Sequence, residues 1–233
     1  MSNGVILWES SAIVCIATGL KRPSSNKKTG PMIQTYIIRK DMHPVEAIKT
    51  GNDDAICGDC VHRGVNGKKR SCYVRVNQSV SQVYRCYTDG GYENEWTYDL
   101  FRDRKVRAGA YGDPAYVPHS IWKGIYEVAA GMTGYTHRWK NDFAQGYKDY
   151  LMASVDSTAE LEQAWDMGWN TFRVRPQGTK KIKGEAQCPA ATESPAETEC
   201  AKCLLCCGNQ SKVRGVSLDV HGIGSKHFNV TLN

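Results

Sequence analysis

The stretch from Lys105 to Arg175 decides the fold, because strand and helix patterns alternate along it. It begins with KVRAGAY (105–111), an expected strand that ends at the turn residues Gly112-Asp113-Pro114. From Pro118 to Ala130, apolar residues recur at helical spacing, which predicts an amphipathic helix that stops at Gly131. The first half of the stretch therefore reads as a strand followed by a helix.

The alternation continues through the second half of the stretch. A short strand is expected at 133–137, and a weaker helical segment at 140–147. LMASV (151–155) is the next expected strand. Ser157, with Glu160 three residues later, has the spacing of a capping box and predicts a helix that ends at Gly168. A further strand is expected at 171–175.

Strand–helix–strand units in series require a parallel sheet with right-handed crossovers. Further strands are expected at 4–9, 12–18, 32–40 and 215–220. The expected fold class is α/β, either a partial (β/α) barrel or an open parallel sheet, with cysteine-rich metal-binding loops. We expect one domain over 1–233, with N-terminal strands in 1–40, the first cysteine group and the βα core in 41–187, and the second cysteine group and a terminal strand in 188–233.

Polar residues follow the expected strands at the points where a site forms in parallel α/β folds. The candidates for a pocket at these strand ends are Asp113, His137, Arg138 and Asp156. Each of them alone is more readily a helix cap or a surface group, and only together do they form the polar floor of a pocket. Catalytic residues are not identified, although His137 or Asp113 is suited to proton transfer if the protein is an enzyme.

Composition narrows the functional classes. The chain has 233 residues, 30 basic and 24 acidic, and a net charge of +6. Its most apolar stretch, 12–20, is too short to span a bilayer, and the N-terminus lacks the features of a signal peptide. We expect a cytoplasmic protein with no membrane partner. A small molecule or a host macromolecule remains open as a partner, and nucleic acid is not favoured at this charge.

Ten cysteines in a chain expected in a reducing compartment point to metal rather than to disulfides. The first group is Cys57-x2-Cys60 followed by Cys72, and the second is Cys188-Pro189 followed by Cys200-x2-Cys203-x2-Cys206. A two-residue gap lets two thiolates turn toward one ion. The remaining three cysteines, Cys15, Cys86 and Cys207, are expected outside the site.

The second group favours iron, because Cys-x2-Cys-x2-Cys with a remote Cys-Pro is the ligand set of a bacterial-ferredoxin [4Fe-4S] cluster. We expect one or two such clusters, with zinc as the alternative. The fourth ligand of the first group is open between His62, His43, another cysteine such as Cys86, or no protein group. A different arrangement would pair Cys57 and Cys60 with Cys203 and Cys206 around one zinc ion.

The ordered series of motifs resembles small uncharacterised phage-encoded cysteine-cluster proteins. The residues that carry the resemblance are Ile56 to Cys60 with His62-Arg63, Cys72 to Val74, Arg107 to Pro114, Gly134 to His137, Cys188-Pro189 and Cys200 to Cys206. The resemblance covers roughly 34–222. It implies a viral protein acting in a bacterial host cytoplasm, and it implies no particular activity.

The expected arrangement of a three-cysteine group on a partial (β/α) barrel is also distantly similar to that of radical S-adenosylmethionine (SAM) iron–sulfur proteins. These proteins place a three-cysteine cluster at the mouth of a partial TIM barrel. Their usual loop is Cys-x3-Cys-x2-Cys, whereas this chain has Cys57-x2-Cys60-x11-Cys72. We therefore expect an iron–sulfur cluster-binding phage protein with a cluster-adjacent pocket, either without enzymatic activity or as a redox or radical-type enzyme. We expect both cysteine groups at one rim of the fold. The alternative is a zinc-stabilised binding module that contacts host protein or nucleic acid.

Overall fold

The computed structural model describes residues 2–64, 69–191, 194–222 and 224–228. Ten strands form two five-stranded sheets among these residues, in the orders β1-β2-β3-β4-β5 and β6-β7-β8-β10-β9. The strands of the first sheet are β1 (Gly4–Glu9), β2 (Ile13–Thr18), β3 (Ile33–Arg39), β4 (Lys105–Tyr111) and β5 (Gly131–Thr133). Those of the second are β6 (Tyr135–Thr136), β7 (Met152–Val155), β8 (Thr171–Arg175), β9 (Glu185–Gln187) and β10 (Gly215–Asp219).

The first sheet is mixed. β1 pairs antiparallel with β2, and β2 pairs antiparallel with β3. β3 then pairs parallel with β4, and β4 pairs parallel with β5. Strands β2 and β3 are almost entirely buried, as expected for their continuous apolar sequences IVCIAT and IQTYIIR. The N-terminal strands therefore extend the parallel core as an antiparallel edge.

The second sheet is parallel throughout, and it continues the first sheet at Gly134. On one side of this residue β5 pairs with β4, and on the other side β6 pairs with β7. The Gly134 carbonyl accepts a hydrogen bond from Met152 N at 3.0 Å. A Cβ at Gly134 would lie 2.9 Å from the Ala108 carbonyl oxygen and 2.7 Å from Leu151 Cδ2. Only glycine fits where the chain changes its strand partner.

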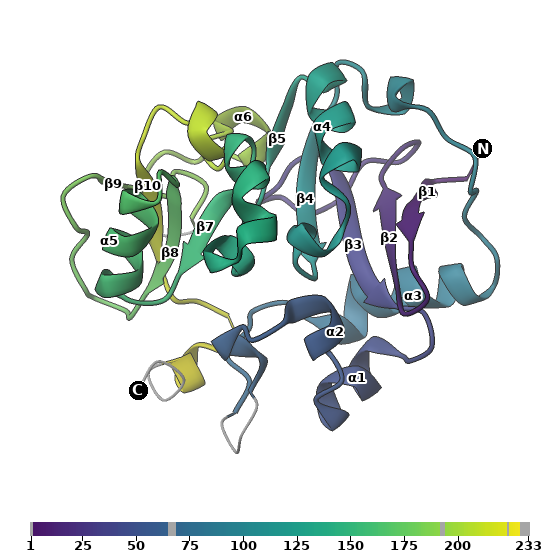
Figure 1. The fold of residues 1–233 in the computed structure, drawn as a ribbon, viewed down its shortest axis with the longest axis horizontal. Helices are drawn as coiled ribbons and strands as arrows, with labels where there is room; N and C mark the ends of the chain where they lie inside the picture. The colour runs from purple at the N-terminus through teal and green to yellow at the C-terminus, as the bar shows by residue number, and fades with distance from the viewer. Residues whose placement is uncertain (1, 65–68, 192–193, 223, 229–233) are drawn as a thin grey trace.

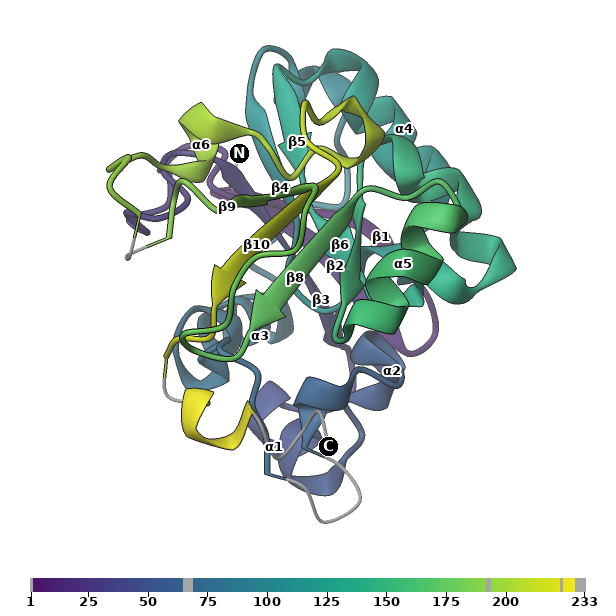
Figure 2. The ribbon, with the colours of Figure 1, turned by 90° about the vertical axis from the view of Figure 1, so that its left-hand side faces the viewer.

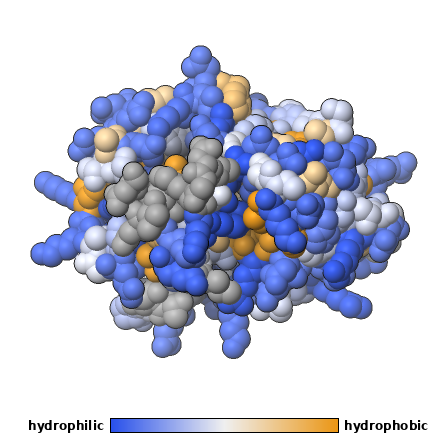
Figure 3. Space-filling view, turned by 90° about the horizontal axis from the view of Figure 1, so that it is seen from below, coloured by the Kyte–Doolittle hydropathy of each residue, from blue (hydrophilic) through white to orange (hydrophobic). Residues whose placement is uncertain are grey.

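Helices cover the strands on one face and at both ends. α4 (His119–Val128) and α5 (Thr158–Asp166) lie together on one side of the strands in Figure 2. α1 (Pro44–Thr50), α2 (Asp54–Cys57) and α3 (Ser81–Thr88) lie at the lower, carboxyl end of the parallel strands in Figure 1, and α6 (Cys200–Cys203) lies at the upper end. Seen from below in Figure 3, the carboxyl-end face is largely hydrophilic, with a few apolar residues near its middle.

The main core is built from the mixed sheet and the helices that pack on it. It includes the fully buried indoles of Trp122, Trp139 and Trp169. Two of these indoles also donate hydrogen bonds to backbone carbonyls, Trp122 to Pro114 at 2.8 Å and Trp139 to Ser154 at 3.0 Å. A second, smaller apolar cluster contains Phe172, Val216 and Leu218 together with Cys188. The second cysteine group thus begins inside an apolar cluster of its own.

The α/β class and the open sheet expected from the sequence are confirmed. The described strands do not close into a barrel, because β1 and β9 remain as outer edges. The three expected strand–helix–strand units are present, and Ser157 caps α5 by accepting from Glu160 N at 3.1 Å. The single strand expected at 133–137 is instead two strands divided at Gly134. The helical stretch expected at 140–147 is a 3₁₀ helix, Asp142–Asp149. β9, α1, α2, α3 and α6 were not expected. No helix among the described residues has the length and apolarity needed to cross a membrane.

Replacing Gly134 by alanine tests the junction between the sheets. We expect Gly134→Ala to lower the free energy of unfolding by about 1–3 kcal/mol, because the new methyl group collides with backbone at Ala108. Gly146→Ala is the control, since the three atoms nearest its Cβ belong to the His119 side chain, the closest at 3.2 Å, and not to backbone; we expect a smaller loss than at Gly134. Urea unfolding measures both. Equal stability of the two variants would contradict the tight fit at Gly134.

Candidate metal-binding cavity

A cavity of about 180 Å³ opens between the strands and the loops at their ends. Its volume is roughly ten times what one water molecule needs. All seven cysteines of the two groups line it: Cys57, Cys60, Cys72, Cys188, Cys200, Cys203 and Cys206. Every cysteine of the chain is a free thiol. Cys15, Cys86 and Cys207 are not among the lining residues, as expected.

The first group is shaped by a tight turn after α2. Gly58 has φ +59°, and a Cβ there would lie 2.5 Å from the Tyr116 hydroxyl. This position requires glycine for its conformation and for its space. The next residue, Asp59, forms an ion pair with Arg138, whose guanidinium also lies 5.8 Å from the centre of the Tyr116 ring. Arg138 therefore holds the Cys57–Cys60 turn from outside the cavity.

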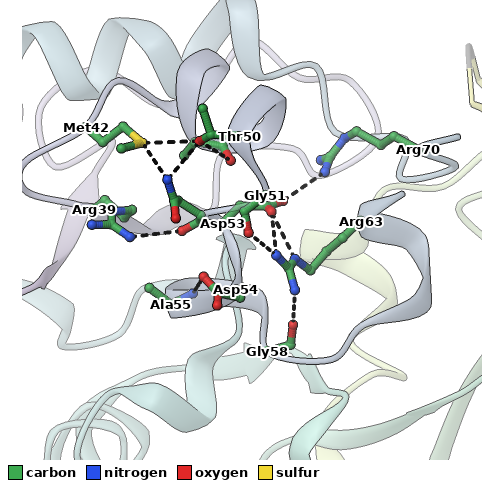
Figure 4. A network of polar contacts seen from close by, with 12 residues as sticks. Arg39, Met42, Thr50, Gly51, Asp53, Asp54, Ala55, Gly58, Arg63 and Arg70 are labelled. Carbon is green, nitrogen blue, oxygen red and sulfur yellow. Dashed lines mark hydrogen bonds and ion pairs between the residues drawn. The ribbon is translucent and has the colours of Figure 1, made fainter. Parts of the chain in front are cut away.

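A buried ion-pair network braces the same turn from its other side (Figure 4). Arg63 Nε donates to Asp53 Oδ1 at 2.9 Å, and its two terminal nitrogens donate to the carbonyls of Gly51 and Gly58. The side chains of Arg63 and Asp53 are 6% and 1% exposed. Arg70 reaches the second carboxylate oxygen of Asp53 at 3.4 Å. One arginine thus joins the residues before α2 to the Cys57–Cys60 turn.

Cys72 returns to the first group by backbone pairing. The amides of Ser71 and Cys72 both donate to the carbonyl of His62, at 3.2 and 3.1 Å. These two hydrogen bonds bring Cys72 back beside the turn that contains Cys60, although eleven residues separate the two cysteines in the sequence. The three thiols of the group are therefore positioned by hydrogen bonds that do not involve sulfur.

The second group is held by three separate parts of the chain. Cys200 N donates to the Lys28 carbonyl at 2.8 Å, and Cys188 N donates to the Ser217 carbonyl at 2.8 Å. Cys200 and Cys203 stand one turn apart on α6, so they share a face. Leu204 then adopts φ +52° and turns the chain, and the Cys206 carbonyl accepts from Gly134 N at 3.0 Å. The junction of the two sheets therefore also anchors the second group.

The two groups lie at opposite ends of the cavity, not at one rim as expected. α2, which ends at Cys57, lies below the strands in Figures 1 and 2, and α6 lies above them. Along β4, Arg107 is the neighbour of Cys200, whereas Tyr111 is the neighbour of Cys57. The expected convergence was wrong because sequence spacing groups local thiols but does not say which end of a sheet each loop reaches.

Burial and mutual proximity act on the thiols of each group. Burial and the thiols of Cys188, Cys200 and Cys203 raise the pKa of Cys206 well above its usual range. At the other end, burial and the thiols of Cys60 and Cys72 do the same to the pKa of Cys57. Such thiols are protonated at neutral pH unless a cation lies beside them, so metal binding would release protons.

The spacing of the thiols is wider than one zinc ion needs. Tetrahedral zinc with Zn–S bonds of about 2.3 Å places its sulfur ligands about 3.8 Å apart. Among the described residues, no three thiols lie within 4.8 Å of one another. A four-iron cube binds each thiolate at a separate corner and therefore accepts wider spacing. The arrangement also keeps Cys57 and Cys60 away from Cys203 and Cys206, against the alternative of a shared zinc ion.

A cation and two phenols lie in the cavity beside the second group. Arg107 Nη2 donates to Tyr73 Oη at 2.7 Å and to Tyr135 Oη at 3.2 Å. The charges of Arg107 and Lys28 lower the pKa of Cys200 and so oppose the effect of burial on it. Arg107 has no carboxylate partner among the described residues. Its charge therefore favours an anionic neighbour.

The four pocket candidates have different surroundings. Asp113 lines the cavity, but its carboxylate accepts from Thr136 Oγ1 at 2.6 Å, from His137 N at 2.8 Å and from Ala115 N at 3.0 Å. It thus holds the backbone at the end of β6. Arg138 is turned toward Asp59 and is not a lining residue. His137 lines the cavity, and Asp156 lies behind it.

His137 and Asp156 meet a third residue, His62. His62 Nε2 lies 2.9 Å from Asp156 Oδ1, and His137 Nε2 lies 3.5 Å from Asp156 Oδ2. His137 Nε2 is also 3.7 Å from Cys60 Sγ. Burial lowers the pKa of His137, but the charges of Cys60 and Asp156 outweigh it and hold that pKa well above its usual range. Burial raises the pKa of Asp156, and the two imidazoles lower it further than burial raises it.

The open question of a fourth ligand for the first group is narrowed by these positions. His43 caps α1 by accepting from Val45 N at 3.3 Å, and its ring packs edge-on against Tyr84. Neither His43 nor Cys86 lines the cavity. His137 is the imidazole beside Cys60, and it was not among the candidates for that ligand.

Several residues that shape the cavity were not singled out from the sequence. They are Arg63, Arg70, Ser71, Arg107 and Tyr135. Their importance arises from contacts over long sequence separations. The sequence offered one signal for Arg107: it is a charged residue inside an expected strand.

Comparison with protein-family models, with curated proteins and with solved structures finds no significant match. The function therefore has to be inferred from the geometry of this cavity.

Replacing Arg63 tests how the first group is held. We expect Arg63→Met to lower the free energy of unfolding by about 3–5 kcal/mol, because it leaves the buried Asp53 carboxylate with only the longer contact to Arg70. Arg102→Met is the matched control, since Arg102 and Asp99 are 58% and 72% exposed and their pair is worth at most about 1 kcal/mol. Thermal and urea unfolding compare the two. Similar losses in both variants would contradict the bracing role.

Proposed function

We propose that the protein is an iron–sulfur protein with two clusters, one at each end of a cavity that receives a small molecule. Cys188, Cys200, Cys203 and Cys206 would hold one [4Fe-4S] cluster. Cys57, Cys60 and Cys72 would hold the second. A reducing cytoplasm, the host's if the chain is viral, belongs to the same proposal because all seven ligands must remain free thiols.

The observation that carries the proposal is the gathering of all seven thiols on one cavity in two separate sets. Cysteines placed for packing alone have no reason to share a lining. Within the second set, Cys188 approaches Cys206 although it lies outside the Cys200–Cys206 run. The second set supplies one thiol for each corner of a four-iron cube.

Charge also supports clusters at both ends. A cluster bound by thiolates is negative, and a basic side chain stands beside each set. Burial raises the pKa of Cys72 at the first end and of Cys206 at the second, and the charges of Arg70 and Arg107, respectively, oppose that rise. Such cations offset the charge of a reduced cluster in a partly buried site.

The first set has three thiols, which would leave one iron without a cysteine ligand. His137 and the interior of the cavity are the neighbours of that position. When bound, such a cluster supplies an iron that can coordinate a ligand and exchange an electron. The chain's own part is to exclude water with the apolar wall of Phe172, Val216 and Leu218 and to orient a ligand with Arg107. If the protein is an enzyme, the proposal implies a redox or radical-type reaction on the small molecule in the cavity.

Iron and sulfide counts test the proposal. Protein reconstituted without oxygen should be brown and hold about eight iron and eight sulfide ions per chain. Cys203→Ser and Cys57→Ser should each retain about half of these ions, because each removes a ligand from a different cluster. Chemical assays of iron and sulfide, with the visible spectrum, provide the measurement.

Cys207→Ser is the matched control, since Cys207 adjoins Cys206 but does not line the cavity; it should keep the full content. Colourless protein with stoichiometric zinc would instead support the zinc-stabilised binding module. Loss of both clusters from either single variant would overturn the assignment of two separate sets.

A further inference from the structure

His62, His137 and Asp156 form a compact group distinct from the cysteine sets. Their ligand atoms lie within 4.8 Å of one another, and no other three potential ligands in the described part of the chain do so. The group joins three elements: the turn after Cys60, the end of β6 and the end of β7. Carboxyl ends of neighbouring parallel strands are the usual place for such convergence.

Each member is held by a partner outside the group. His62 Nδ1 lies 2.8 Å from Ser71 Oγ, and its ring stacks on Phe228 with centroids 5.3 Å apart. The backbone of His137 donates to the buried Asp113. The backbone of Asp156 donates to Glu160 Oε2 at 2.8 Å, in the capping box of α5. Ligands oriented by outer partners in this way are typical of metal centres.

The Asp156 carboxylate gives the group the negative charge that a divalent cation needs. The Asp156 side chain is 14% exposed, and its ion-pair partners among the described residues are the two imidazoles. If the Nδ1–H of His62 donates to Ser71, its Nε2 presents a lone pair toward the carboxylate. Two acceptors at 2.9 Å then need a proton or a metal ion between them.

We infer that His62, His137 and Asp156 form a binding site for one divalent transition-metal ion, separate from the iron–sulfur clusters. Two imidazoles and one carboxylate suit zinc, iron(II), manganese or cobalt, and three protein ligands leave coordination positions free. His62 and His137 line the cavity, so those positions face it. The ion would act there as a Lewis acid toward a ligand or a water molecule.

The site does not depend on the proposed clusters. No thiol in the described residues lies within 4.8 Å of all three ligand atoms, although Cys60 approaches His137. A metal bound by nitrogen and oxygen can also be told from one bound by sulfur. Cobalt(II) on thiolates gives intense charge-transfer absorption in the near ultraviolet, whereas cobalt(II) on nitrogen and oxygen gives only weak visible bands.

The test is a titration with Co²⁺ of the full chain after anaerobic loading with iron and sulfide. Wild-type protein should retain one equivalent of Co²⁺ by metal analysis after desalting, with no new thiolate charge transfer in the difference spectrum against the loaded protein. Asp156→Asn should lose this equivalent, because an amide is a poor ligand. His221→Gln, which changes a cavity histidine outside the group, should keep it. Iron and sulfide contents measured on the same samples report separately on the proposed clusters.

Ser71→Ala provides a second variant that leaves all three ligands in place. Losing the partner of His62 should weaken Co²⁺ binding roughly 10–100-fold without changing the spectrum. If Asp156→Asn folds by circular dichroism and binds Co²⁺ like wild type, the group is a hydrogen-bond network only and the inference fails. If Asp156→Asn does not fold, Ser71→Ala decides the question. Ser71→Ala protein that binds Co²⁺ as tightly as wild type would then show that the inference fails.

Discussion

The structure depends on the change of strand partner at Gly134. One strand passes from β4 to β7 at this residue, and the close approach of the Ala108 carbonyl leaves no room for a side chain there. The same residue donates its amide to Cys206. One residue therefore joins the two sheets and, through its amide, also holds the loop that carries the second cysteine group.

From this junction the cavity acquires two unlike ends. The carboxyl end holds three thiols, an imidazole at 3.7 Å from one of them, and the His62–Asp156–His137 group. The amino end holds four thiols and the Arg107–Tyr73–Tyr135 contacts. Each end thus gathers thiols beside the cavity, and the carboxyl end adds two imidazoles and a carboxylate, all of which are groups that bind metal ions. The account of function rests on this gathering of metal-binding groups.

Local signals made much of the fold predictable. The strands at 105–111 and 151–155 and the capped helix after Ser157 depend on periodicity and capping within a few residues, and they appear as expected. The division of the expected strand 133–137 at Gly134 was missed because the residues around Gly134 do not show that β5 pairs with β4 whereas β6 pairs with β7. β9, with three residues, is too short to give a periodic pattern.

The candidate site shows the same limit. Spacing identified the seven cysteines, and position after a strand identified His137 and Asp156, but their grouping with His62 needs contacts across 94 residues. Asp113 was expected among the pocket residues and does line the cavity, but its carboxylate accepts hydrogen bonds from the Thr136 hydroxyl and from two backbone amides. A sequence pattern gives the type of ligand. The fold decides which ligands meet.

Anomalous X-ray diffraction at the iron edge, on crystals of anaerobically reconstituted protein, tests the central claim most directly. The account predicts two separate iron peaks, one bounded by Cys57, Cys60 and Cys72 and one by Cys188, Cys200, Cys203 and Cys206. Absence of iron at either end, or a single metal shared between the two cysteine groups, would contradict it.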